Sequence, residues 1–216
     1  MLMGCCSKKI CIGCWYADKL RQKREKKEQI CPFCRRPVPS TEEENDIDEK
    51  KRIEANDPVA LSTCAQDLRD KGDHDKAFEY YSKAAALGDA DAHHNLSFMY
   101  RKGRGVEKDE EKEIFHLEEA AIAGHPDARH NLACYWARKG RFDKAVKHYI
   151  IAAKLGYDES LIVLKHCYNT YGSVSKTDLA ATLRAHQAAV DATKSPQRDQ
   201  AEKHYAKYIP QFTKTS

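Results

Sequence analysis

Six cysteines near the N-terminus are the residues whose type and spacing could do chemistry. They follow the pattern C-C-x4-C-x2-C-x16-C-x2-C and are Cys5, Cys6, Cys11, Cys14, Cys31 and Cys34. Two cysteines separated by two residues can turn both thiolates toward one ion, and four thiolates complete the tetrahedral shell of Zn²⁺. Because the N-terminus lacks the apolar core of a signal peptide, these clustered pairs predict a zinc site rather than disulfides. The spacing matches neither common ferredoxin pattern.

The cysteine module, at about residues 5–38, resembles an all-cysteine RING finger. The resemblance rests on CCSKKICIGCW at 5–15 and on CPFCR at 31–35, which is a typical end of such a finger. It implies interleaved ligand pairs, in which the first two cysteines form the second pair and share one ion with the last two. The middle two would share another ion with a first pair that this sequence lacks. We expect that pair upstream, with Met1 as an internal residue of a longer reading frame.

A second ligand arrangement and two flanking features remain open. The last four cysteines can close a single zinc-ribbon-like site and leave Cys5 and Cys6 spare. Trp15, directly after the second pair, either packs over the zinc knuckle or contacts a partner. The basic segment Lys19–Gln29 is predicted to be helical. It is interpreted as a solvated face rather than a nucleic-acid surface, because glutamates interrupt its charge and no aromatic residue is interleaved for base stacking.

The RING resemblance also implies a function for the module. RING modules recruit a ubiquitin-conjugating enzyme and contribute no nucleophile; by resemblance, Pro32 would contact that enzyme and Arg35 would contact ubiquitin. The sequence has no phosphate-binding loop, nucleophile elbow or paired-carboxylate signature, so no catalytic residue is predicted. The first hypothesis is a scaffold belonging to a ubiquitin ligase. The alternatives are a non-catalytic adaptor with structural zinc and a nucleic-acid-associated factor.

The elements after the module are predicted from an internal repeat. Anchor positions at Asn56, Gly88, Gly124 and Gly156 lie 32, 36 and 32 residues apart. Apolar positions within each unit recur every three or four residues, which predicts two helices joined by a turn, with the glycine at a left-handed helix end. Aligned side chains that we expect in the core are Cys64, Leu96, Leu132, Leu164, Leu68, Tyr100, Trp136, Tyr168, Tyr81, Leu117, Tyr149 and the alanine pairs at 84–85, 120–121 and 152–153.

The middle unit resembles the Sel1-like branch of the tetratricopeptide superfamily. The matching residues are Ala92, Leu96, Tyr100, Gly103, Gly105, Val106, Asp109, Ala120, Ala121 and Gly124. The resemblance covers about residues 55–170. It implies an all-α fold, a right-handed solenoid of helical hairpins with a concave surface that binds a protein or peptide. In related arrays an asparagine on the first helix holds an extended peptide, so Asn95 and Asn131 are the predicted contacts. Hydrogen bonding along their own helices is the rival interpretation.

No metal site is predicted within the repeats. His93 and His94 are adjacent, whereas helical histidine ligands are usually three or four residues apart. Four further histidines are scattered along the repeats and need no special role: His116, His125, His148 and His166. Cys134 and Cys167, like Cys64, are predicted to be small core residues.

The predicted organisation is a zinc module at 1–40, an acidic linker at 41–54, repeats at 55–171, capping helices at 172–209 and a tail at 210–216. The repeat units lie near 56–87, 88–123 and 124–155, with a partial unit at 156–171. Ser175 and Asp178 would begin the first capping helix, with Leu179, Leu183 and Ala189 as its apolar face. No apolar run approaches the roughly 18–20 residues of a spanning helix. We expect a cytoplasmic or nuclear protein that is neither secreted nor transmembrane.

Overall fold

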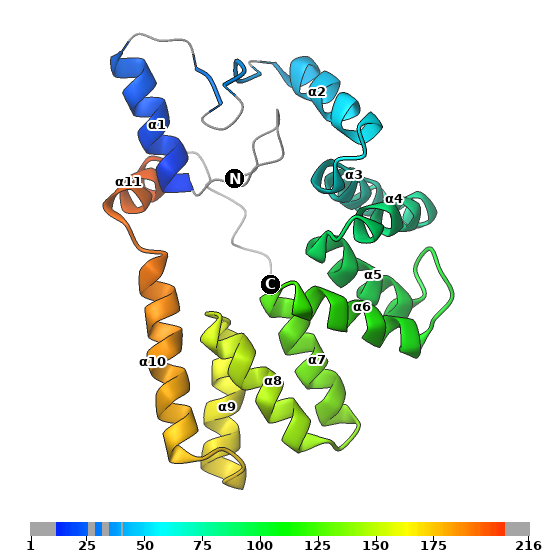
Figure 1. Ribbon diagram of the computed structural model, residues 1–216, viewed down its shortest axis with the longest axis vertical. Helices are drawn as coiled ribbons and strands as arrows, with labels where there is room; N and C mark the ends of the chain where they lie inside the picture. Colours follow the sequence, from blue (N-terminus) through cyan, green and yellow to red (C-terminus); the bar gives the residue numbers. More distant parts are fainter. Residues whose placement is uncertain (1–11, 26–28, 32–34, 40, 206–216) are drawn as a thin grey trace. The chain divides into compact units, whose positions relative to one another are not determined.

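A computed structural model describes residues 12–25, 29–31, 35–39 and 41–205 of the chain (Figure 1). These residues are all-α apart from one antiparallel bridge between Ile30 and Pro37. They divide into two compact units, Asn56–Asp191 and the remainder. The helices are α1 (Ile12–Arg24), α2 (Glu42–Glu54), α3 (Pro58–Asp70), α4 (His74–Ala86), α5 (Ala90–Lys102), α6 (Glu110–Ile122), α7 (Pro126–Arg138), α8 (Phe142–Lys154), α9 (Asp158–Tyr171), α10 (Lys176–Ala192) and α11 (Pro196–Tyr205).

The unit Asn56–Asp191 is a solenoid of helical hairpins (Figure 1). The helices of each hairpin, α3–α4, α5–α6 and α7–α8, pack against each other, and the second helix of each also packs against the first helix of the next. The prediction of an all-α hairpin solenoid is therefore confirmed. None of the helices in the described ranges combines the length and the apolar character that crossing a bilayer needs.

Local signals in the sequence set the ends of these helices. Aspartates at the N-terminal caps accept hydrogen bonds from backbone N–H groups of the first turn, which would otherwise have no partner. These caps are Asp57, Asp73, Asp89 and Asp109, for α3, α4, α5 and α6. The glycines after α4, α6 and α8 have φ values of 84°, 86° and 93°, as the repeat predicted. Gly88, Gly124 and Gly156 thus end each hairpin in the left-handed conformation that glycine adopts without strain.

The core of the solenoid lies between its helices and repeats with them. Both residues of every aligned alanine pair are at most 6% exposed, which allows the second helices to pack closely. The aligned leucines Leu96, Leu132 and Leu164 are at most 2% exposed, as predicted. The predicted burial is only partial for Cys64, Leu68, Trp136 and Tyr168. The Trp136 ring, for example, is covered on one side by the Lys144 ammonium group, 4.2 Å from the ring centre.

Helix α10 begins as predicted, and two residues of its predicted apolar face, Leu179 and Ala189, are half-buried. The Ser175 hydroxyl accepts a hydrogen bond from the Asp178 N–H at 3.0 Å and donates one to the Asp178 carboxylate at 2.7 Å. Leu183, predicted to be on the buried face, is exposed, whereas Thr182 and His186 are buried. His186 Nε2 on this buried face lies 2.8 Å from a carboxylate oxygen of Asp158 on α9.

The other unit contains α1, α2, α11 and two short paired segments, 29–31 and 35–38, which we call the hairpin. Trp15 is buried, which favours packing over partner contact. The Gln22 side chain joins α1 to the hairpin, since its amide accepts a hydrogen bond from the Ile30 N–H and donates one to the Ile30 carbonyl. The predicted helix Lys19–Gln29 was wrong in its bounds, because α1 ends at Arg24 and Gln29 already belongs to the hairpin. The acidic stretch is helical as α2 and is capped by Thr41.

Candidate partner-binding site

A row of polar side chains links the first helices of successive repeats. Arg69 on α3 donates a hydrogen bond to the Asn95 amide oxygen on α5 at 2.6 Å. His94, the residue before Asn95 on α5, accepts a hydrogen bond from the Asn131 amide on α7 at 3.0 Å. His130 on α7 lies 2.8 Å from the Ser160 hydroxyl on α9. We call this set the polar row: Arg69, His94, Asn95, His130, Asn131 and Ser160.

An open pocket of about 380 Å³ lies at one end of the polar row. Its charge is predominantly positive: the lining contains two guanidinium groups and one carboxylate, and two histidines lie beside them. The lining residues are Arg69, Asp70, His74, His94, Asn95, Phe98 and Arg104. Arg69 is partly neutralised, because its guanidinium lies 3.1 Å from the Asp70 carboxylate.

Three cationic side chains lie close to the Phe98 ring beside the pocket. The guanidinium carbons of Arg101 and Arg104 lie 5.3 and 5.7 Å from the ring centre, and the Lys102 ammonium lies 6.0 Å from it. No ion pair involves Arg104 within the described part of the chain. The pocket therefore presents a cationic and aromatic surface, which suits carboxylates.

Both predicted asparagines belong to the polar row. Asn95 lines the pocket, and Asn131 reaches it through its hydrogen bond to His94. The Asn95 amide also donates to the Asp91 carbonyl on its own helix at 2.8 Å, as the rival interpretation expected. Asn95 thus makes the helix-surface bond and still lines the pocket, and the structure leaves its contact with a partner as a prediction. His74 and Arg104 were missed because no like residue stands at the corresponding position of another unit, and Arg69, which aligns with Arg101, was missed because a basic residue near a helix end is no signal by itself.

Histidines join α5 to α6 and to the start of α7, through contacts of His116 and His125 that the sequence did not predict. The Nδ1 atoms of His93 and His116 lie 2.9 Å apart, so one must carry a proton and the other a lone pair. The His94 ring stacks on His125 with centroids 4.5 Å apart. Burial lowers the pKa of both His94 and His116 to about 4, helped by the neighbouring histidine in each case.

Cys134 is more than a small core residue. Its sulfur lies 3.4 Å from His130 Nε2 and 3.2 Å from the Tyr149 hydroxyl. Burial opposes ionisation, yet the hydrogen bonds with His130 and Tyr149 leave the pKa of the Cys134 thiol below its ordinary value. Burial is the main cause that raises the pKa of Tyr149. The Cys134 thiol, at the contact between α7 and α8, therefore ionises more readily than an ordinary cysteine.

The predicted zinc ligands lie mostly outside the described residues. This is true of Cys5, Cys6, Cys11 and Cys34, and also of the predicted enzyme contact Pro32. Cys14 is exposed in the first turn of α1, and Cys31 is buried in the hairpin. Within the described ranges, no group of three or more histidine, cysteine or acidic side chains could hold a metal ion. The zinc ligand set therefore stays a prediction.

The chain is similar to known Sel1-repeat proteins. The Sel1 repeat family model matches residues 68–89, 90–125 and 126–157. The crystal structure of a Sel1 repeat protein from Oxalobacter formigenes superposes with a TM-score of 0.58 at 27% identity, covering 72% of this chain and 66% of that protein. The protective antigen c5321 of uropathogenic Escherichia coli, which displays an SLR fold, gives a TM-score of 0.54 at 18% identity, covering 76% and 37%.

This chain thus spans two thirds or less of these structures. No curated protein matches it. The family-model match also confirms the Sel1-like resemblance of the middle unit and extends it to both neighbours. Residues 68–157 match the Sel1 repeat model, and the solenoid they build is a scaffold suited to protein–protein interaction.

Proposed function

We propose that the chain is a protein-interaction scaffold whose polar row binds an acidic, extended segment of a partner protein. The observation that carries the proposal is the pocket of about 380 Å³ in which Arg69, Arg104 and His94 surround Asn95. Carboxylates form their strongest hydrogen bonds with guanidinium groups, which can bind them through two parallel N–H donors.

The asparagines keep hydrogen-bonding capacity for a peptide backbone. An amide side chain has two N–H donors and an oxygen with two lone pairs. Asn95 uses one donor for Asp91 and one lone pair for Arg69, so a donor and a lone pair remain. Asn131 uses one donor for His94. An extended peptide lying along the polar row could therefore be held at both asparagines, while its acidic side chains face the arginines.

Fluorescence anisotropy with a labelled twelve-residue peptide of alternating Glu and Gly tests this proposal. We expect Arg104→Glu to weaken binding about tenfold, which corresponds to about 1.4 kcal/mol, because it replaces a pocket cation with an anion. Arg104 contacts Phe98 at the surface, so the substitution leaves the helical core intact. Arg184→Glu, an equal charge change at an exposed position on α10, is the matched control and should leave binding unchanged.

Two results would contradict the proposal. Equal weakening by both arginine substitutions would mean that the peptide responds to net charge and not to the pocket. Absence of binding at about 100 µM protein in low salt would exclude an affinity in the range of specific peptide recognition.

We also propose that the N-terminal module binds Zn²⁺ through its cysteines in the manner of a RING finger. The hairpin supports this: Arg35 N–H donates to the Cys31 carbonyl at 2.9 Å, and Arg35 takes a left-handed φ of 58°. Cys31 is thus held by backbone hydrogen bonds to Arg35 and Arg36, next to the predicted ligand pair. Bound Zn²⁺ would tie the hairpin to the other cysteines and so stabilise the module.

Elemental analysis tests zinc binding directly. We expect about one Zn²⁺ per chain, lost in Cys31→Ala and kept in Cys64→Ala, since Cys64 lies on α3 within the repeats. A zinc content that is zero, or that Cys31→Ala leaves unchanged, would overturn the module's assignment. Autoubiquitination with a panel of ubiquitin-conjugating enzymes then separates two functions. Activity that requires Cys31 supports a ligase in which Arg35 contacts ubiquitin, whereas zinc without activity supports an adaptor.

A further inference from the structure

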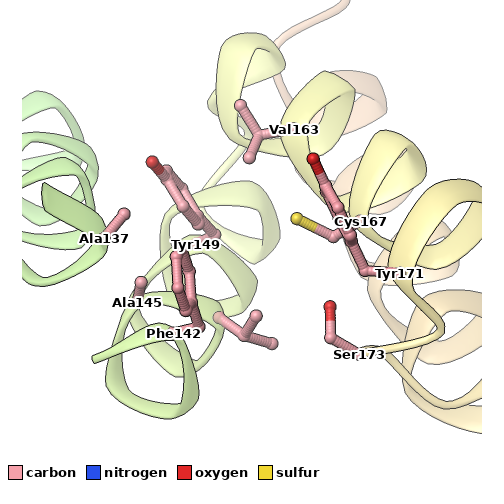
Figure 2. A pocket seen from close by; sticks show the side chains of 9 residues that line it. Ala137, Phe142, Ala145, Tyr149, Val163, Cys167, Tyr171 and Ser173 are labelled. Atoms are coloured by element: carbon pink, nitrogen blue, oxygen red, sulfur yellow. The ribbon is translucent and has the colours of Figure 1, made fainter. Parts of the chain in front are cut away.

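A second pocket, also of about 380 Å³, lies where α7 and α8 meet α9. Its walls are almost entirely apolar. Figure 2 shows Phe142, Ala145 and Tyr149 of α8 on one side and Val163, Cys167 and Tyr171 of α9 on the other. Ala137, Val146 and Ser173 complete the lining. This volume is at the small end of ligand pockets and suits one bulky apolar side chain.

The repeat register shows what occupies the same place one repeat earlier. Phe142 is the first residue of α8, and Glu110 is the first residue of α6, 32 residues before it. Tyr171, at the end of α9, corresponds in the same way to Lys139 after α7. Glu110 and Lys139 form an ion pair of 2.7 Å. The last junction therefore has two aromatic residues where the preceding junction has an ion pair.

The first junction is covered by the chain itself. The first residue of α4 is His74, and its carbonyl oxygen is so close to Gly105 that a Cβ on Gly105 would overlap it. The loop of the Sel1-type unit thus packs against the start of α4. At the last junction, by contrast, Phe142 is 64% and Tyr171 is 70% exposed beside an apolar pocket. Paired exposed aromatic side chains at the mouth of an apolar pocket are typical of protein-interaction hot spots.

The charge around this pocket indicates the chemistry of its partner. The stretch from Arg138 to Lys147 has five basic residues and one acidic residue, Asp143. Arg138 and Lys139 are partly compensated by acidic residues of α6, at 3.8 and 2.7 Å. Arg141 is paired with Asp143 at 3.8 Å. The exposed Lys147 lies on α8, which lines the pocket, and the exposed Lys176 follows the lining residue Ser173 by three residues, so these two ammonium groups add positive charge to this end of the solenoid.

We infer that the α8–α9 junction is a docking site for a partner segment that carries one bulky apolar side chain flanked by carboxylates. The apolar side chain enters the pocket between Phe142 and Tyr171, and the carboxylates face the basic residues around it. This site differs from the polar row, where the acidic groups themselves enter the pocket.

The test uses the full chain and a fluorescein-labelled twelve-residue peptide with one central Phe among Glu and Ser residues. The variant Phe142→Glu/Tyr171→Lys transplants the ion pair of the preceding junction and keeps the solenoid folded. We expect it to weaken binding at least about tenfold. Tyr171→Ala alone, at a 70% exposed position, should weaken binding in the same direction without altering the thermal unfolding midpoint. Ile122→Glu, at a 75% exposed position on α6, is the control that should bind normally.

Three results of the binding assay would overturn the inference. The first is that both pocket variants bind the peptide as tightly as the parent protein does. The second and third are that the parent protein binds equally well a peptide with Lys in place of Glu, or one with Ala in place of Phe. A dimer of the protein alone that dissociates in the double variant, measured by sedimentation, would also overturn it, because a second copy would then be the occupant. Arg104→Glu separates the two sites, since it should leave binding of the Phe peptide unchanged.

Discussion

Buried histidines link neighbouring helices, and their burial favours the neutral form of His94 and His116. The His93–His116 contact joins two ring nitrogens at 2.9 Å, which requires one donor and one acceptor. His94 combines ring stacking on His125 with acceptance of a hydrogen bond from Asn131. A proton on His94 Nε2 would remove the acceptor of the hydrogen bond from Asn131, and a proton on His116 would place a positive charge in a buried site beside His93. The residues that link α5, α6 and α7 are therefore sensitive to acid.

We predict that the solenoid loses stability as the pH falls from about 6.5 to about 4. The folded-state pKa values of His94 and His116 are about 4, below the ordinary 6.5. Above pH 6.5 both states are neutral and there is no effect. Below it the unfolded chain binds protons that the folded chain excludes, at a cost of about 1–3 kcal/mol for each histidine.

Thermal unfolding followed by circular dichroism at pH 7.5 and 4.5 measures this loss. His116→Asn keeps a polar group near His93 and removes the titration, so the variant should lose less stability between the two pH values than the parent. His166→Asn, at an exposed position on α9, is the control and should lose as much as the parent. Equal acid sensitivity of the parent and His116→Asn would contradict the account.

At the scale of elements, the loop Gly103–Asp109 distinguishes the middle unit from its shorter neighbours. Gly105 adopts φ 68° and packs its backbone against the start of α4. The same loop carries Arg104 to the pocket of the polar row. The loop thus connects two repeats and supplies one of the pocket's cations, which explains why this unit has four more residues than the units beside it.

Gly105→Ala should therefore destabilise the protein more than an equivalent change at an open glycine. The new Cβ would overlap the His74 carbonyl and occupy a left-handed backbone conformation, at a combined cost of about 2–4 kcal/mol. At Gly72, with φ 87°, a Cβ meets nothing within 4 Å, so Gly72→Ala should cost only about 1–2 kcal/mol. Urea unfolding of both variants gives the comparison. A Gly105→Ala protein that is no less stable than Gly72→Ala would show that the loop does not pack on α4.

For the whole molecule, the sequence alone predicted those structural features that depend on neighbouring residues within one helix or turn. The period of apolar residues predicted the hairpins, the alanine pairs predicted their close packing, and Gly88 and Gly124 predicted left-handed helix ends. The polar row could be predicted only in part. Asn95 and Asn131 align between repeats, but the bonds that link Arg69 to Asn95 and His94 to Asn131 join different repeats and depend on their stacking. The apolar pocket arises from a departure from the repeat, at Phe142 and Tyr171, which a repeat pattern does not reveal.

The central claim is that the first helices of the Sel1 repeats bind an acidic partner segment at the polar row. Hydrogen–deuterium exchange of the full chain, with and without the saturating Glu/Gly peptide, locates the bound segment most directly. We predict slower exchange at the C-terminal turns of α3 and α5 and in the loop Gly103–Asp109, with α10 unchanged. Protection that is absent there, or that appears mainly on α10, would contradict the claim.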